Sequence, residues 1–408
     1  MKGNCCWVSK LNFDAVKIHF RYRYASLLLI LLTAACVDRI TFDAIESATY
    51  GMVVDGFISD QPGPYTVNVS SSFDPESTRN LKNAVSRLTL ELSDNVGNKE
   101  TLTEVSPGNY QTAADGIRGI PGRVYTLTVK THDGRTYVSR PDTLPVPASI
   151  DRLYFEYTLK RDTDGKDQAG YDFYTDNTSG TTGSRWWKWR FTGTFQAETR
   201  PELVEVGGAG TASKTQCFPL DGKCNYLPPC SGWRNTGTTR NFSFAKLFPC
   251  TCCTCWYNLY NDAPVLNDAL YTSTRSLPGV FVHRVPVDYW IFMHRLRAEV
   301  FLFTMSRESF RFFQAIKDQR DAVNSLFQPV SGRMPVNFTQ TEGRVEEVQG
   351  LFYAAGVSSK ALFIERDEVP GGKDLPDLDS LIGMGIGKRS CLEIFPNATS
   401  VRPSFWKD

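Results

Sequence analysis

The chain has 408 residues, with 45 Lys and Arg against 44 Asp and Glu, and a net charge of +1 at pH 7. This balance excludes the strongly basic surface that nucleic-acid-binding proteins use, so no nucleic-acid partner is expected. A hydrophobic content of 41% with 12% aromatic residues is enough for folded cores. The length is too great for one core and favours two or three domains.

An apolar segment, 24–36, lies near the start of the chain. The part from 25 to 35 would rise about 16 Å as a helix, roughly half the hydrocarbon thickness of a bilayer, so it cannot span a membrane. Basic residues precede it, and small residues lead into Cys36. We therefore predict a lipoprotein signal peptide over 1–35, lipidation of Cys36 and a tether over 36–46. The alternative is a buried helix that ends in an ordinary thiol.

Residues 47–146 show the alternation of apolar and polar side chains that is typical of strands. Apolar residues repeat with a period of two in 65–69, 88–92 and 125–129, and turn-forming residues separate these segments. We predict an immunoglobulin-like antiparallel β-sandwich over 47–146. Prolines between 141 and 147 then indicate a stiff linker and the boundary to a second domain.

The second domain, 147–408, is predicted to be larger and β-rich, so the whole chain is expected to be mainly β. A strand predicted over 185–195 has two different faces, with Trp187, Trp189 and Phe191 on one and Trp186, Lys188 and Arg190 on the other. Aromatic residues at this spacing more often belong to a core than to a ligand platform.

Three further elements are predicted in the second domain. Strands are expected at 280–287 and 293–303. One amphipathic helix should follow, with Ser306 as its N-cap and a stripe of apolar residues, namely Phe312, Phe313, Ile316, Val323 and Phe327. The segment 345–364 is predicted to form two strands that turn around Ser358 and Ser359.

Eight cysteines follow Cys36 and are candidates for disulfides: Cys217, Cys224, Cys230, Cys250, Cys252, Cys253, Cys255 and Cys391. All but the last lie in a Gly- and Cys-rich insert, 207–256, that is predicted to be mostly irregular. In an exported chain disulfides are the default. The overlapping C-x-x-C spacings in 250–255 would also provide enough sulfur for zinc. The sequence does not determine the pairing.

Motifs for catalysis are scarce. After the signal segment only His132, His283 and His294 remain, and none belongs to a known nucleophile or zinc-protease motif. The glycine-rich segment 383–388 lacks the first glycine of a phosphate loop, and the acidic segment 162–173 lacks the glutamate of a calcium loop. We expect no catalytic, cofactor-binding or metal-binding residues, although paired carboxylates that are distant in sequence stay an open alternative.

Several segments, taken in their order, resemble one known family. The lipidation motif is followed by VVDGFISDQPGPYTVNVS at 53–70, ESFRFFQAIKDQ at 308–319, GLFYAAG at 350–356 and RPSFW after Cys391. This order resembles the Bacteroidota outer-membrane lipoproteins known as domain of unknown function 4249. The resemblance implies an outer-membrane location and a TonB-dependent transporter as partner, with no established activity. It also implies a second cysteine soon after Cys391, which is missing here, so Cys391 pairs elsewhere or is free.

Two functions are compatible with these features. The first is a non-enzymatic accessory, anchored by lipid to the cell outer membrane, that helps a TonB-dependent transporter to capture a nutrient. The second is a cell-envelope hydrolase of glycans or peptides whose active site the sequence does not reveal. Trp186, Trp187 and Trp256 would suit stacking against sugars or peptides, but core packing explains them equally well. The sequence leaves open which side of the membrane the protein faces.

Overall fold

The computed structural model describes residues 51–71, 84–161, 164–180, 183–201, 229–235, 244–267, 275–323, 336–342 and 348–407. All of these residues belong to one compact unit. The predicted signal peptide, tether and lipidation site at Cys36 lie outside the described residues, as do Cys217 and Cys224.

The described residues are mainly β, as predicted. The strands are β1 (Met52–Ser59), β2 (Thr66–Ser71), β3 (Thr89–Asp94), β4 (Lys99–Thr101), β5 (Thr103–Ser106), β6 (Asn109–Gln111), β7 (Val124–Lys130), β8 (Thr136–Ser139), β9 (Asp142–Thr143), β10 (Ser149–Arg161), β11 (Asp167–Thr178), β12 (Trp186–Glu198), β13 (Trp233–Asn235), β14 (Phe244–Lys246), β15 (Thr254–Tyr260), β16 (Val265–Leu266), β17 (Ser276–Pro286), β18 (Arg295–Met305), β19 (Phe338–Glu342) and β20 (Gln349–Glu365). The helical segments are η2 (Pro229–Ser231), α2 (Arg307–Val323), η3 (Arg366–Glu368), η4 (Gly372–Asp374), α3 (Leu378–Gly383) and α4 (Cys391–Ile394). Among the described helices, none has the length and apolar character needed to cross a membrane.

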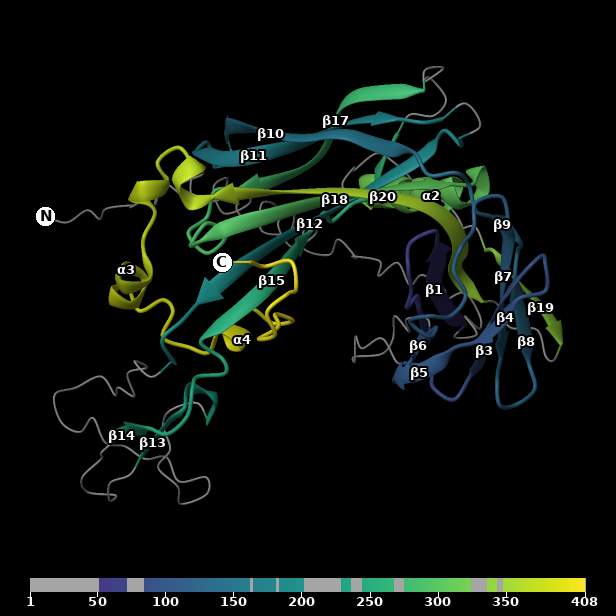
Figure 1. Ribbon diagram of the computed structural model, residues 1–408, viewed down its shortest axis with the longest axis horizontal. Helices are drawn as coiled ribbons and strands as arrows, with labels where there is room; N and C mark the ends of the chain where they lie inside the picture. Colours follow the sequence, from purple (N-terminus) through teal and green to yellow (C-terminus); the bar gives the residue numbers. More distant parts are fainter. Residues whose placement is uncertain are drawn as a thin grey trace, which may run out of the picture. The chain divides into compact units, whose positions relative to one another are not determined.

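One large sheet connects early and late parts of the described chain (Figure 1). Its strand order is β15-β12-β18-β20-β1-β2-β6-β5, with β16 paired to β12. Neighbouring strands are antiparallel except for β1 and β20, which run parallel with Val54 opposite Gly350. The long strand β20 therefore joins the N-terminal strands through β1 and the C-terminal strands through β18.

The N-terminal strands form a sandwich around one core. The inner side chains of β1, β2 and β6 meet those of a smaller sheet, β19-β8-β7-β3-β4, and Val54, Leu90 and Leu127 are fully buried between them. Phe338 of β19 and Phe352 of β20 complete this core. The residues of the predicted domain 47–146 thus do not close the sandwich alone, because two of its strands come from far along the chain. Its immunoglobulin type stays a prediction.

The proline-rich linker that the sequence predicts is packed against the rest of the protein. Its strand β9 pairs with β7. The buried Asp142 carboxylate accepts hydrogen bonds from Ser309 Oγ (2.9 Å) and from the Ala354 backbone N–H (3.0 Å). Burial raises the pKa of Asp142. This one side chain ties the linker to both α2 and β20.

A second, larger core lies between the large sheet and the sheet β10-β11-β17. Trp187, Trp189 and Phe191 of β12 are buried in it, as their alternation predicts. Phe191 contacts Phe173 of β11, with ring centroids 5.0 Å apart. Successive side chains of a strand point to opposite faces, so Lys188 and Arg190 lie on the face of β12 that points away from this core.

The prediction of two strands in 345–364 is wrong, because 349–364 belong to the single seventeen-residue strand β20; residues 345–347 lie outside the described residues. Ser358 and Ser359 lie opposite Leu302 and Phe301 of β18, in unbroken register. The Ser358 hydroxyl donates to the Ala148 carbonyl (2.7 Å). Serine favours turns when its side chain forms a hydrogen bond to the nearby backbone. Here the Ser358 hydroxyl bonds to a residue far away in the sequence, and the backbone continues as a strand paired with β18.

The predicted amphipathic helix is α2. The Ser309 backbone N–H donates to Ser306 Oγ (3.2 Å), so Ser306 caps the helix as expected. Phe310 and Phe313 of α2 pack in a third apolar cluster with Phe303 of β18 and Tyr353 of β20. These sheet residues point away from the larger core, so α2 covers part of the other face of the large sheet (Figure 1).

Candidate functional site

A groove lies on the face of the large sheet that points away from the larger core, next to the part that α2 covers. Six of its lining residues come in pairs from three neighbouring strands, namely Arg190 and Thr194 of β12, Trp256 and Tyr260 of β15, and Arg297 and Glu299 of β18. Its volume is about 360 Å³, which lies in the range of small-molecule sites. Phe301 both lines the groove and packs in the cluster under α2.

The C-terminal tail forms one wall of this groove through Thr399, Pro403 and Phe405. Two connections hold the tail against β15. Trp256 and Thr399 form an isolated β-bridge, and Cys255 is joined to Cys391 by a disulfide. The tail also reaches β12, because Trp406 Nε1 donates to Gln196 Oε1 (2.9 Å). The wall is therefore fixed to the sheet at several points.

Two arginines in the groove stack on aromatic rings. The guanidinium carbon of Arg190 lies 4.7 Å from the ring centroid of Phe301, and that of Arg297 lies 4.0 Å from the ring centroid of Phe405. Arg297 also donates to Glu299 Oε2 (2.6 Å). Such stacking holds a guanidinium in place, while its N–H groups, which point outward in the plane of the guanidinium, stay available to a ligand. The groove thus presents oriented cationic donors.

Trp256 provides a donor that lacks an acceptor. Its side chain lines the groove and is 8% exposed, and its buried indole N–H has no hydrogen-bond partner among the described residues. Leaving a buried donor unpaired costs about 1–3 kcal/mol. The neighbouring polar pair is satisfied internally, since Thr194 Oγ1 donates to Asn258 Oδ1 (2.7 Å). The indole N–H is therefore an unpaired donor that is buried behind the groove surface, and the exposed donor group that lines the groove is the guanidinium of Arg190.

A second groove, of about 460 Å³, lies beside β12, β18 and β20 and is lined by Gln196, His294, Arg295, Glu365 and Trp406 among others. His294 Nε2 lies 3.2 Å from Glu198 Oε1. The hydrogen bond from His294 lowers the pKa of the Glu198 carboxyl, against the opposing effect of burial. This histidine–carboxylate pair is the arrangement in the described residues that comes nearest to acid–base chemistry.

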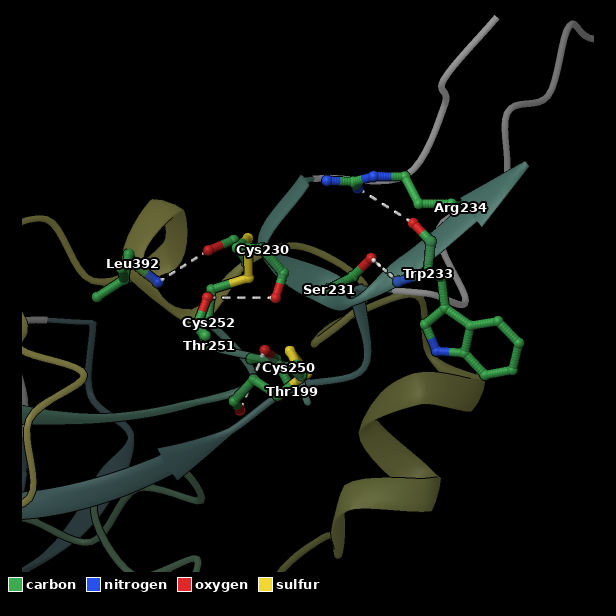
Figure 2. Close-up of a disulfide and its surroundings, with 11 residues drawn as sticks. Thr199, Cys230, Ser231, Trp233, Arg234, Cys250, Thr251, Cys252 and Leu392 are labelled. Carbon is green, nitrogen blue, oxygen red and sulfur yellow. Dashed lines mark hydrogen bonds between the residues drawn. A yellow bond between two sulfur atoms is a disulfide. The ribbon is translucent and has the colours of Figure 1, made fainter. Parts of the chain in front are cut away.

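Six of the eight candidate cysteines form three disulfides in the structure. The pairs are Cys230–Cys252, Cys250–Cys253 and Cys255–Cys391. Figure 2 shows the first pair, where the Thr251 backbone N–H also donates to the Cys230 carbonyl (2.8 Å). Cys391 thus has its partner in the insert, 136 residues earlier in the chain. In the described residues, no three side chains of His, Cys, Asp and Glu lie close enough together to hold a metal ion.

Lys188 lies under α2 in a cage of aromatic rings. Its Nζ is 3.5 Å from the ring centroid of Phe313 and donates to the Tyr353 hydroxyl (3.2 Å). Burial lowers the pKa of Lys188 to about 7, and the positive charge of Arg190 acts in the same direction. Burial likewise raises the pKa of Tyr353. This polar pair lies beneath the helix and outside the groove lining, so we assign it to the packing of α2.

The other residues that the sequence singles out lie apart from the groove. His132 is in the β7–β8 turn, and His283 packs on Phe191, where burial lowers its pKa. Trp187 belongs to the larger core and Trp186 packs on Phe310 of α2. Of the three tryptophans considered as ligand platforms, Trp256 is the one that lines the groove.

Sequence reasoning missed most of the groove. Arg297 and Glu299 belong to β18 and Tyr260 belongs to β15, and only the pairing of both strands with β12 brings them together. The available signal was the polar face of the strand 185–195, where Lys188 and Arg190 alternate with buried aromatic residues. A strand with one aromatic and one cationic face indicates that the cationic face has a role of its own. It does not show which residues of other strands lie beside that face.

The fold and the groove define a mainly β protein that offers binding groups on one face of a large sheet. A family model described as Domain of unknown function (DUF4249) matches residues 37–361. The chain therefore belongs to this family, as the order of its segments predicted. The disulfide partner Cys391 and the tail that walls the groove lie beyond the matched residues. No curated protein and no solved structure shows a significant match.

Proposed function

We propose that this protein is a non-enzymatic accessory of a TonB-dependent nutrient uptake system, anchored to the outer membrane by lipid on Cys36, and that it captures its ligand in the groove of β12, β15 and β18. The observation that carries the binding role is the groove itself, with arginines that are oriented by stacking on aromatic rings. The apolar run and small residues before Cys36 support the anchor.

The groove lining favours binding over catalysis. Its carboxylate, Glu299, accepts a hydrogen bond from Arg297. Hydrolysis of glycans usually needs two carboxylic groups placed across the scissile bond, and the groove lining includes one. The remaining polar groups are donors and hydroxyls that suit recognition.

The alternative function is a cell-envelope hydrolase, and one observation favours it. The His294–Glu198 pair beside the second groove could accept a proton from water. The lining of that groove contains no serine, threonine or cysteine that could act as a nucleophile. We therefore rank the accessory role first.

Affinity purification of the full chain from its native membrane tests this proposal. We expect a large outer-membrane barrel to be recovered in equal amount. The Cys36→Ser variant is the matched control, since it should leave the membrane fraction. A chain that purifies alone and hydrolyses a glycan or peptide library, with activity lost in His294→Gln, would establish the hydrolase instead.

A further inference from the structure

The groove has an excess of hydrogen-bond donors. Arg190 is exposed and stacks on Phe301, and no carboxylate of the described residues forms an ion pair with it. Arg297 is neutralised in part by Glu299. The groove therefore offers one uncompensated positive charge and several guanidinium donors to a ligand rich in acceptors.

The aromatic rings at the rim are exposed. Tyr260 is 56% exposed and Phe405 is 37% exposed, and they come from β15 and from the tail wall. Exposed rings of this kind can stack against the apolar C–H face of a sugar while polar groups bind its hydroxyls. Thr192 and Asn258 provide such polar groups between the rings.

The floor of the groove argues against a peptide that adds as a strand. β12 pairs with β18 along one side and with β15 and β16 along the other, so its backbone groups are already hydrogen-bonded. Strand addition requires a free sheet edge. The groove-lining strand β15 is the edge of the sheet, and the tail occupies this edge at Trp256 through the bridge to Thr399. A ligand on the floor of the groove is therefore contacted through side chains, which suits hydroxyl and carboxylate groups.

Resting on the proposed ligand-capture function, we propose that the groove binds an acidic saccharide, with Arg190 holding a carboxylate and Tyr260 and Phe405 stacking on sugar rings. Arg297 orients the site by holding Glu299, which accepts from a sugar hydroxyl. A neutral saccharide would leave the charge of Arg190 unused.

Calorimetric titration of the purified full chain with trigalacturonate tests the ligand class, with the methyl-esterified trisaccharide as the neutral counterpart. We expect the acidic sugar to bind at least tenfold more tightly, and added salt to reduce this difference. Arg190→Gln should remove the preference for the acid. Arg161→Gln, at an exposed arginine on β10, should leave it unchanged.

Two further variants keep the test independent of any single substitution. Tyr260→Ala should weaken both sugars, because the stacking ring is lost. Phe405→Ala removes the second exposed ring of the rim and should also weaken both. Equal binding of acid and ester, or a preference that survives Arg190→Gln, would overturn the acidic class. Absence of binding by either sugar would overturn the saccharide proposal, while recovery of the transporter would still support the accessory role.

Discussion

Trp256 and Thr399 exchange two backbone hydrogen bonds, with Trp256 N–H to Thr399 O at 2.8 Å and Thr399 N–H to Trp256 O at 3.0 Å. This bridge lies one residue after Cys255, whose disulfide to Cys391 anchors the tail. The residue with the unpaired indole N–H is thus also the residue that holds the groove wall. Substitutions that loosen the tail should therefore also alter the shape of the groove.

Replacing Cys255 and Cys391 together by Ala should destabilise the protein strongly. Their bridge closes a sequence separation of 136 residues, for which chain entropy gives about 5 kcal/mol. Amide hydrogen exchange in 399–406 should become faster, because the wall loses its anchor. The double Ala variant of Cys250 and Cys253, separated by 3 residues, is the control, with an expected loss of about 2 kcal/mol and unchanged exchange in the tail. Equal losses for the two variants would contradict this account.

Stability should rise with pH above neutral because of Lys188. Its pKa is about 7 in the folded protein and about 10.5 when unfolded, so the unfolded chain binds more protons between these values. Urea unfolding should therefore give a free energy of unfolding that increases by about 1 kcal/mol or more from pH 7 to 9.5.

The Lys188→Met variant should lose this rise, since it removes the group that titrates. Lys99→Met, at a mostly exposed lysine, is the matched control and should keep the rise. If Lys188→Met retained the full pH dependence, another group would have to be responsible.

Asp172 should be essential to the sheet β10-β11-β17. Its side chain is 1% exposed and lies 2.9 Å from Arg284 Nη1 and 2.7 Å from Lys160 Nζ. Asp172→Ala would leave Arg284 without its partner and should cost about 3–5 kcal/mol in thermal or urea unfolding. Asp167→Ala, which breaks the exposed pair with Arg161, should cost at most about 1 kcal/mol.

Asp172 should also make the stability of the protein depend on pH in acid. Burial works against its charge, but hydrogen bonds from Lys160 and Arg284 outweigh this and lower the pKa of Asp172. Its contribution to stability is present above the unfolded value of 3.8 and is lost as pH falls through the folded value. Acid unfolding of Asp172→Asn should therefore be less steep than that of the original chain.

Gly350 should not tolerate a side chain. Its φ is +98°, and a Cβ would lie 2.0 Å from the carbonyl oxygen of Val54 on the parallel partner strand β1. Gly350→Ala should destabilise the protein by more than about 2 kcal/mol, because both backbone strain and the clash oppose it. Gly180→Ala, where a Cβ meets nothing within 4 Å, should change stability by less than about 0.5 kcal/mol. Thermal unfolding of both variants checks the contrast.

The mainly β class, the family, the position of α2 and the buried face of β12 could all be predicted from the amino-acid sequence. These features depend on local patterns: a period of two puts Trp187, Trp189 and Phe191 on one side, and Ser306 with the stripe after it defines a helix. These patterns can be read locally, because the alternation of side chains along a strand, or their spacing along a helix, is the same wherever the element lies in the fold.

Only the tertiary structure decided which distant segments meet. The register of β20 against β18 made one strand where the serines at 358 and 359 suggested a turn, and β19 and β20 completed the sandwich of the N-terminal strands. The partner of Cys391 and the groove around Trp256 were decided in the same way. Contacts between residues more than a hundred positions apart depend on strand pairing and packing over the whole protein, which no local pattern in the chain encodes.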